Sequence, residues 1–94
     1  MFWYVYVARC ADHSLYCGIA KRVAARIAEH DAGKGARYTR GRGPLAVLLT
    51  RRCATHGRAL KIEYAFKQLT RVQKEAVVAE PRRLGAIARK ATRA

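Results

Sequence analysis

The sequence predicts an α+β fold in which helices pack on a small sheet, with elements in the order β-β-α-β-α-α. Three observations predict this class. The first 20 residues hold two runs rich in aromatic and β-branched residues, which are typical of strands. Apolar residues then recur at helical spacing, and one short apolar run separates the helical stretches. At 94 residues and with no internal repeat, the chain is expected to form one domain.

The first two strands are predicted over residues 2–9 and 14–20. The turn-prone stretch Ala11-Asp12-His13-Ser14 lies between them. This spacing suits the two arms of one hairpin, which would bring Tyr6 and Tyr16 close together in space.

A helix is predicted over residues 21–31, because Val23, Ile27 and His30 fall at positions i, i+4 and i+7. Gly33 follows as a C-terminal stop.

Residues 34–44 are predicted to form a basic loop. Its glycines let the backbone approach phosphates closely, so we expect it to clamp a nucleic-acid backbone rather than read bases. The side chains assigned to this contact are Lys34, Arg37, Tyr38, Arg40 and Arg42. The continuously apolar run over residues 45–50 then predicts a third, well-buried strand.

Helical spacing returns over residues 58–69. Thr70 and Gln73 then form a capping-box pattern that opens a last helix, and Pro81 closes it. Residues 81–94 contain five cations and no acid. We expect them to be a basic tail, either mobile or a weak helix that orders on a polyanion, outside a domain that covers residues 1–80.

The charge predicts a polyanionic partner. Twenty Lys and Arg residues against six Asp and Glu residues give a net charge of +14. Clustered cations of this kind displace condensed counterions from nucleic acid. The alternatives are a generally basic surface and an acidic membrane, but no basic helix carries a large apolar face with Trp or Phe.

No membrane-spanning or export segment is predicted. The longest apolar run, residues 1–8, is far shorter than the roughly 20 residues that span a bilayer, and it lacks the features of a signal peptide. The three cysteines form no CxxC pair. Although Cys10 and Cys17 could face each other across the hairpin, reduced thiols and a cytoplasmic location are expected.

Glu63 differs from the other five acids because it borders the apolar face of its helix, next to Ala59 and Phe66. A carboxylate that is half out of water needs a compensating cation. One interpretation is a ligand for Mg²⁺ or Mn²⁺, since these hard cations take oxygen ligands. The other is an i,i+4 ion pair with Lys67, and spacing alone does not separate the two.

Arg26 and His30 are also four residues apart, at the edge of the packed face of their helix. Arg26 could bind the scissile phosphate, and His30 could relay a proton near neutral pH. The alternatives are a solvated cation and a packing histidine. Likewise, a catalytic Tyr6 or Tyr16 needs nearby positive charge to depress a free pKa of about 10, and strand tyrosines otherwise serve packing.

Six motifs follow one another at compatible spacings. They are Tyr4-Val5-Tyr6, Tyr16-Cys17-Gly18-Ile19, Ala25-Arg26-Ile27 with His30, the run 33–44, Glu63-Tyr64 and Lys67-Gln68-Leu69-Thr70. Together they resemble a GIY-YIG nuclease domain over residues 2–80. The likeness is to the small stand-alone bacterial type called URI-like, related to the N-terminal domain of the UvrC excision-repair nuclease and to Slx-type nucleases.

This resemblance implies a three-stranded antiparallel sheet flanked by helices and phosphodiester cleavage that depends on Mg²⁺ or Mn²⁺. By the same resemblance, Tyr6 and Tyr16 hold and activate the attacking water. Arg26 stabilises the pentacovalent phosphate, and His30 assists proton transfer. Glu63 is implied as the sole protein ligand of the metal.

The chain departs from the name-giving motifs in two strand positions. Tyr4 stands at the first Gly and Cys17 at the middle Ile, while the key tyrosines are kept. Ile19 stands where some relatives have a Lys. Gly18 is retained, and the resemblance implies that it permits close backbone packing behind the site.

The leading functional hypothesis is therefore a metal-dependent endonuclease acting on DNA in repair or recombination, with branched, flapped and single-stranded forms left open. Its rival is a non-catalytic nucleic-acid-binding module, or a nuclease subunit that needs a partner; RNA as substrate is a third hypothesis. Glu63 favours the enzyme, because a pure binding module has no need of a carboxylate beside a polyanion. We expect a monomer or weak dimer, with a protein partner for targeting left open.

Overall fold

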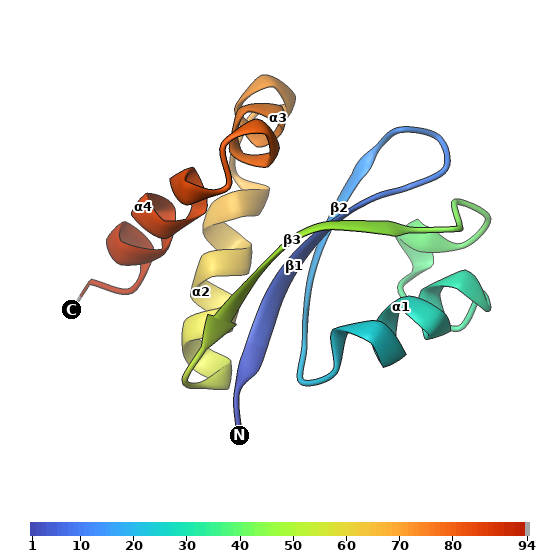
Figure 1. Cartoon of the computed structure of the whole chain (residues 1–94), viewed down its shortest axis with the longest axis horizontal. Helices are drawn as coiled ribbons and strands as arrows, with labels where there is room; N and C mark the ends of the chain where they lie inside the picture. Colours follow the sequence, from blue (N-terminus) through green and yellow to red (C-terminus); the bar gives the residue numbers. More distant parts are fainter. Residues whose placement is uncertain (94) are drawn as a thin grey trace.

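The computed structural model describes residues 1–93, which form a three-stranded antiparallel sheet and four α-helices (Figure 1). The strands are β1 (Trp3–Arg9), β2 (Leu15–Ala20) and β3 (Ala46–Cys53). The helices are α1 (Val23–Asp31), α2 (His56–Lys67), α3 (Arg71–Ala79) and α4 (Arg82–Ala91). The predicted α+β class and the antiparallel sheet are confirmed. None of these helices is long and apolar enough to cross a membrane.

The predicted hairpin forms between β1 and β2. Asp12 shapes its turn, because one carboxylate oxygen accepts hydrogen bonds from both the amide and the hydroxyl of Ser14, at 3.1 and 2.6 Å. Tyr6 pairs with Gly18 and Ala8 pairs with Tyr16. Because side chains alternate along a strand, Tyr6 and Tyr16 lie on the same face of the sheet, as diagonal neighbours.

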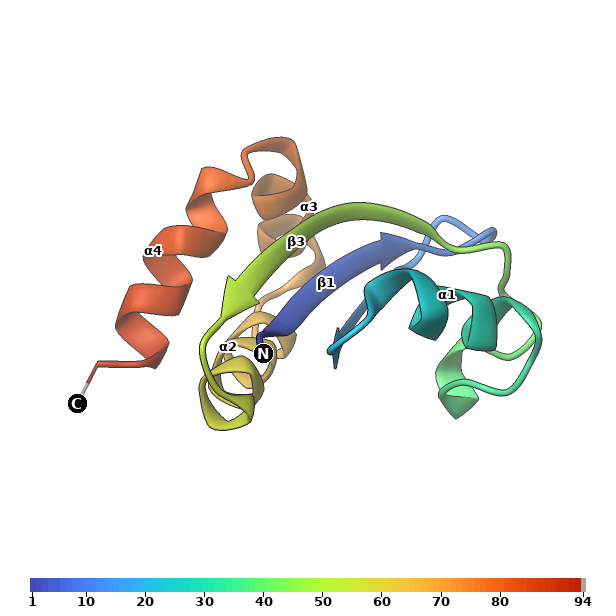
Figure 2. The same cartoon turned by 60° about the horizontal axis from the view of Figure 1, so that its bottom comes forward.

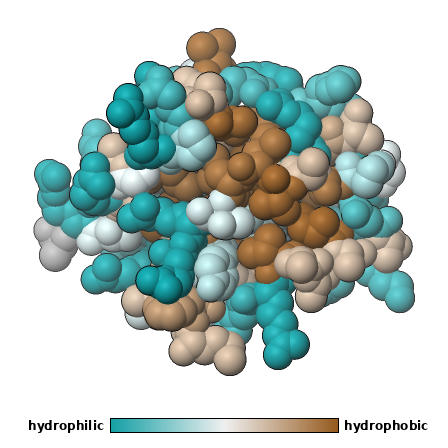
Figure 3. Space-filling model, in the orientation of Figure 1, coloured by the Kyte–Doolittle hydropathy of each residue, from teal (hydrophilic) through white to brown (hydrophobic). Residues whose placement is uncertain are grey.

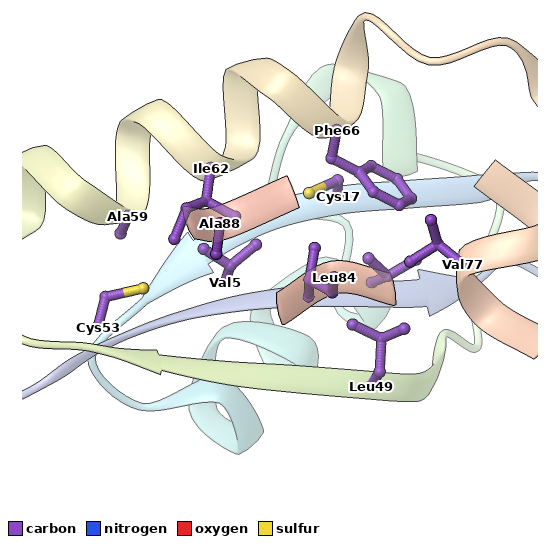
Figure 4. Close-up of a cluster of buried hydrophobic side chains, with 11 residues drawn as sticks. Val5, Cys17, Leu49, Cys53, Ala59, Ile62, Phe66, Val77, Leu84 and Ala88 are labelled. Atoms are coloured by element: carbon purple, nitrogen blue, oxygen red, sulfur yellow. The ribbon is translucent and has the colours of Figure 1, made fainter. Parts of the chain in front are cut away.

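The sheet is covered on both faces, and Figure 2 shows α1 and α4 on opposite sides of it. The larger hydrophobic cluster joins Val5, Val7 and Cys17 of the sheet to residues of α2, α3 and α4 (Figure 4). The smaller cluster lies on the α1 face and contains Tyr6 and Ala8, with Tyr16 packed against it. The candidate catalytic tyrosines therefore belong to the minor core.

The prediction of a well-buried third strand is wrong. The strand order is β2-β1-β3, so β1 is central and β3 is an edge strand. Only Leu49 and Cys53 of β3 are buried, whereas Val47 and Leu48 are exposed. The apolar run carries no information on strand order, and helices cover only one face of β3. Figure 3 shows hydrophobic residues gathered on the side of the molecule where β3 crosses in front.

The expectation of a mobile or weakly helical tail is also wrong. Residues 82–91 form α4, and its Leu84 and Ala88 are each 2% exposed within the larger hydrophobic cluster. The physical reason is an i,i+4 pair of apolar residues among the cations, which is enough to fix a helix against a neighbour. The predicted capping box of α3 is confirmed, with both Thr70–Gln73 hydrogen bonds formed.

Candidate active site

Tyr6 lies at the base of the candidate site, fully buried between β1 and α1. Its ring occupies the space above Gly18 on the paired strand. A Cβ atom at Gly18 would lie 2.6 Å from the Tyr6 hydroxyl and 3.0 Å from the Tyr16 ring. Gly18 is therefore the residue that lets both phenols approach the sheet backbone at this point.

His30 accepts a hydrogen bond from the Tyr6 hydroxyl, as part of a buried chain of hydrogen bonds. The Thr39 hydroxyl donates to the Ala36 carbonyl oxygen at 2.8 Å, so it accepts a hydrogen bond from the Nδ1–H group of His30 at 2.7 Å. The His30 Nε2 atom then accepts from Tyr6 Oη at 2.8 Å. The Ala36 N–H group lies 3.4 Å from Nδ1, but it cannot donate to Nδ1 when that nitrogen carries the proton, so this long contact is not a hydrogen bond in this tautomer.

His30 was expected at the edge of the packed face of its helix, and this placement is wrong. The alternative of a packing histidine agrees with its burial and its two hydrogen-bonded nitrogens. Its side chain is 1% exposed, because the loop that follows α1 folds back over it. The loop approaches so closely that a Cβ atom at Gly35 would lie 2.1 Å from His30 Nδ1. The imidazole is thus fixed between a strand tyrosine and the loop.

Burial determines the protonation states of the Tyr6 phenol and the His30 imidazole. It raises the pKa of Tyr6, with the Tyr16 phenol adding to the rise, while the charge of Arg26 opposes it. Burial and Arg26 lower the pKa of His30. At neutral pH the chain is therefore a neutral phenol donating to a neutral imidazole, and the lowered pKa makes this imidazole a weaker base than a solvent-exposed one.

Tyr16 is half-buried and stands between this chain and solvent. Its ring centroid lies 6.2 Å from that of Tyr6 and 5.0 Å from that of His30, and it stacks on Tyr38 at 5.9 Å. It also lines a pocket of about 260 Å³, hereafter the β2 pocket. The pocket is formed by Leu15, Tyr16, Cys17, Tyr38, Phe66, Lys67 and Lys74. Because β2 is an edge strand, this pocket joins the α1 face to the α2 face.

Arg26 lies close to all three rings. Burial raises the pKa of Tyr16 as it does that of Tyr6, and the charge of Arg26 opposes both rises without reversing them, while it adds to the lowering of the His30 pKa by burial. The Arg26 guanidinium pairs with Glu29 at 3.0 Å on the partly exposed side of α1. An exposed pair of this kind contributes little to stability, so the guanidinium is free to exchange its partner for a phosphate.

Glu63 reaches the same region from α2. Burial raises the pKa of Tyr16 and raises that of Cys17 to about 12, and the Glu63 carboxylate adds to both rises. The side chain is 19% exposed and pairs with Lys67 at 3.4 Å. The predicted i,i+4 ion pair is therefore present, and it ties the carboxylate to Lys67, which itself lines the β2 pocket.

The donor set here suits a hard divalent cation held in part by its substrate. Within residues 1–93, no group of three His, Cys, Asp or Glu side chains could hold a metal ion alone. Mg²⁺ commonly binds through one or two carboxylates and fills its other positions with waters and substrate phosphates. Glu63 fits that requirement, whereas both ring nitrogens of His30 are already hydrogen-bonded inside the core.

The basic loop lies beside these side chains. Lys34, Arg37 and Arg40 are exposed, and Tyr38 stacks on Tyr16. Arg42 is held instead by an ion pair with Asp12 and by the Tyr38 ring, 4.4 Å from its guanidinium carbon. The structure brings Tyr6, Tyr16, Gly18 and His30 together under this loop. Glu63 is linked to this group through Lys67, which lines the β2 pocket, and lies itself in a neighbouring pocket on α2.

Two residues of the site were not predicted from the sequence. Thr39 fixes the His30 tautomer, and Gly35 makes room for its ring. The available signal was their position inside the run 33–44, which was interpreted only for its charges and its backbone freedom.

Known proteins share the sequence family and the fold of this chain. Residues 2–76 match the model of the GIY-YIG catalytic domain. A UPF0213 protein of Natronomonas pharaonis is 48% identical over 77 residues, covering 82% of this chain and 91% of the relative. A UPF0213 protein of Vibrio cholerae is 47% identical over 78 residues, covering 82% and 77%.

Two solution NMR structures resemble this fold. One is the UPF0213 protein BH0048 of Bacillus halodurans, with 43% identity and a TM-score of 0.56. The other is the protein EF2693 of E. faecalis, with 40% identity and a TM-score of 0.58. Each likeness covers 84% of this chain and 84% of the solved chain. The chain belongs to the GIY-YIG family of nuclease-type domains.

Proposed function

We propose that this chain is a divalent-metal-dependent endonuclease that hydrolyses phosphodiester bonds of DNA. The observation that carries the proposal is the buried Tyr6–His30–Thr39 chain behind the pocket that Tyr16 lines. A polar chain inside a small core costs free energy unless every group is bonded, and apolar residues would pack there more simply. A proton-transfer role explains why these groups are present.

The burial of the two phenols suggests separate roles. Tyr16 lines the β2 pocket and would hold the attacking water. Tyr6 lies behind it and donates to His30, so a proton from the water would enter at Tyr6 Oη as the Tyr6 proton moves to His30 Nε2. The water oxygen forms the new bond to phosphorus. The bond to the leaving sugar oxygen breaks, and that oxygen takes a proton from solvent.

Arg26 and Glu63 would act on the phosphate itself. Arg26 would release Glu29 and bind the non-bridging oxygens, where charge grows in the transition state. Glu63 would hold Mg²⁺ or Mn²⁺. The bound cation would supply Lewis-acid polarisation of the phosphate. Lys67, which pairs with Glu63, is positioned to balance its charge before the cation binds.

The net charge of +14 and the exposed loop cations support a nucleic-acid substrate. The resemblance to the excision-repair nuclease supports DNA over RNA, and repair or recombination as the process. The loop residues Lys34, Arg37 and Arg40 would contact backbone phosphates on either side of the scissile bond, while Tyr38 would bring Arg42 to the pocket.

A cleavage panel tests this proposal. Duplex, single-stranded, flapped and branched DNA and an RNA would be incubated with the protein and Mn²⁺ or Mg²⁺. Glu63→Gln keeps the side-chain shape and should reduce cleavage by at least about 100-fold. Its DNA binding should be equal or tighter, because one negative charge is lost.

Glu80→Gln is the matched control, since Glu80 pairs with Arg82 and Arg83 outside the site. This variant should cleave like the wild type. The proposal fails if the wild type cleaves no nucleic acid with either metal, or if Glu63→Gln and Glu80→Gln cleave equally well. If the protein cleaved only the RNA, the substrate would be RNA and not DNA.

A further inference from the structure

A second cationic pocket lies at the opposite edge of the sheet from the β2 pocket. Four arginines line it, and three of them come from three different elements and are free of an aromatic partner within residues 1–93: Arg51 of β3, Arg58 of α2 and Arg89 of α4. We call these three residues the arginine site. The pocket measures about 200 Å³ and shares no lining residue with the β2 pocket. The fourth lining arginine, Arg52, is held over the Phe2 ring, with its guanidinium carbon 4.4 Å from the ring centroid.

Gly85 lies beneath two of these guanidinium groups. It is buried inside α4, and a Cβ atom there would contact an Nη1 atom of Arg51 at 3.4 Å and one of Arg89 at 3.5 Å. Two cations thus converge over one helix position that carries no side chain. Glycine inside a helix costs about 1 kcal/mol relative to alanine, and a side chain larger than a methyl group would displace both guanidiniums.

The site concentrates positive charge without a compensating acid. In the part of the chain that the structure describes, the ion pairs of Asp and Glu side chains involve other cations. Arg58 stands in the first turn of α2, where the helix dipole disfavours a cation and where there is no acidic residue. The charges of Arg51 and Arg58 both act on the thiol of buried Cys53, lowering a pKa that burial raises.

Like charges held together at a concave surface mark a site for an anion. We propose that Arg51, Arg58 and Arg89 bind backbone phosphates of a nucleic acid, at a place separate from the proposed catalytic pocket. This inference rests on the proposed function in that the ligand is nucleic acid, and it adds a second contact surface. The two sites lie at the two edges of the sheet, so a bound strand or duplex arm would reach both.

Binding with a charge-matched control tests the inference. The affinity of the full chain for a labelled DNA duplex would be measured by fluorescence anisotropy in EDTA, at several salt concentrations. Arg51→Gln/Arg89→Gln should bind about 10-fold more weakly at 0.1 M salt. Its plot of log affinity against log salt should be shallower by about two, one for each phosphate contact removed.

Lys90→Gln/Arg93→Gln is the control, because it removes the same charge from exposed positions at the same end of the chain. It should change affinity less than about twofold. Equal losses in the two double variants would overturn the site in favour of a general charge effect. If binding depends on the arginine site but the wild type never cleaves, the inference stands and the proposed function fails.

A measurement on the wild type covers the case in which the arginine variant does not fold. In NMR titrations, a short DNA oligonucleotide should shift the amide signals of Gly85 and Ala88 at micromolar concentration. Inorganic phosphate should need a far higher phosphate concentration for the same shifts. Shifts produced equally well by inorganic phosphate would assign the site to a small anion, and no shifts with DNA would remove the site altogether.

Discussion

At the scale of single residues, two glycines determine where the polar rings of the candidate site can lie. Gly18 admits the Tyr6 and Tyr16 rings against the sheet, and Gly35 admits His30 against the loop. In both cases the space that a methyl group would need is already filled by an aromatic side chain. The hydrogen-bonded chain from Tyr6 to Thr39 therefore depends on residues that carry no functional group.

Gly35→Ala should disrupt this chain. Its new Cβ atom would lie 2.1 Å from His30 Nδ1, so the imidazole or the loop must move. Overpacking of this kind lowers the free energy of unfolding by about 1–3 kcal/mol. Urea denaturation should show that loss, and cleavage by the folded fraction should fall because the Tyr6–His30 bond is displaced.

Gly57→Ala is the matched control. A Cβ atom at Gly57 would have no atom within 4 Å, and the residue lies in α2. Alanine is favoured over glycine in a helix by about 0.5–1 kcal/mol, so this variant should be slightly more stable and fully active. Equal stability of the two alanine variants would show that the loop adjusts around His30 without strain.

At this scale, the sequence predicted the contacts between residues that are close along the chain and missed those that depend on a separate segment. Spacing correctly brought Tyr6 and Tyr16 together, because strand pairing across a short turn is a local property. It placed His30 on the correct helix but at the wrong depth. The covering loop is bonded to His30 through Thr39, nine residues away, and helical periodicity carries no information about that loop.

At the scale of elements, α4 and β3 depart most from what the sequence suggested. Each was predicted from the composition of its own segment, but its position in the fold depends on the elements that pack against it. Apolar β3 lies at an edge because β1 pairs with both other strands. Basic α4 is fixed because Leu84 and Ala88 complete the cluster over α2 (Figure 4). Removing residues 82–94 would therefore expose core and also remove cations.

Leu84→Ala tests the contribution of α4 to the fold. Leu84 is 2% exposed, and replacing a buried leucine by alanine costs about 2–5 kcal/mol of unfolding free energy. Leu60→Ala on α2 is the control, because Leu60 is 43% exposed and a surface change of this kind stays within about 0.5 kcal/mol. If chemical denaturation gave the same small change for both, α4 would not be part of the cooperative core.

At the scale of the whole molecule, the charge is divided between the two edges of one thin sheet. The loop cations lie beside β2 and the arginine site lies beside β3, in a molecule that measures 38 × 32 × 18 Å. Composition alone predicted a nucleic-acid partner from the excess of cations. It could not predict two separate surfaces, because their separation depends on the sheet order and on the packing of α4.

This arrangement predicts a threshold in DNA length. A duplex rises 3.4 Å per base pair, so about 11 base pairs are needed to run the 38 Å length of the molecule. Duplexes of 6, 10, 14 and 20 base pairs should bind with an affinity that rises sharply between 6 and 14. The reason is that occupying the second site becomes intramolecular once one DNA can reach both.

Measuring the same duplexes with Arg51→Gln/Arg89→Gln separates the two-site effect from the statistical gain in affinity that any longer duplex gives. That gain remains when one site is removed, because it depends only on the number of positions at which the protein can bind. The threshold should vanish in this double variant and persist in Lys90→Gln/Arg93→Gln. A gradual rise with length, identical in all three proteins, would mean that DNA contacts only one edge of the sheet at a time.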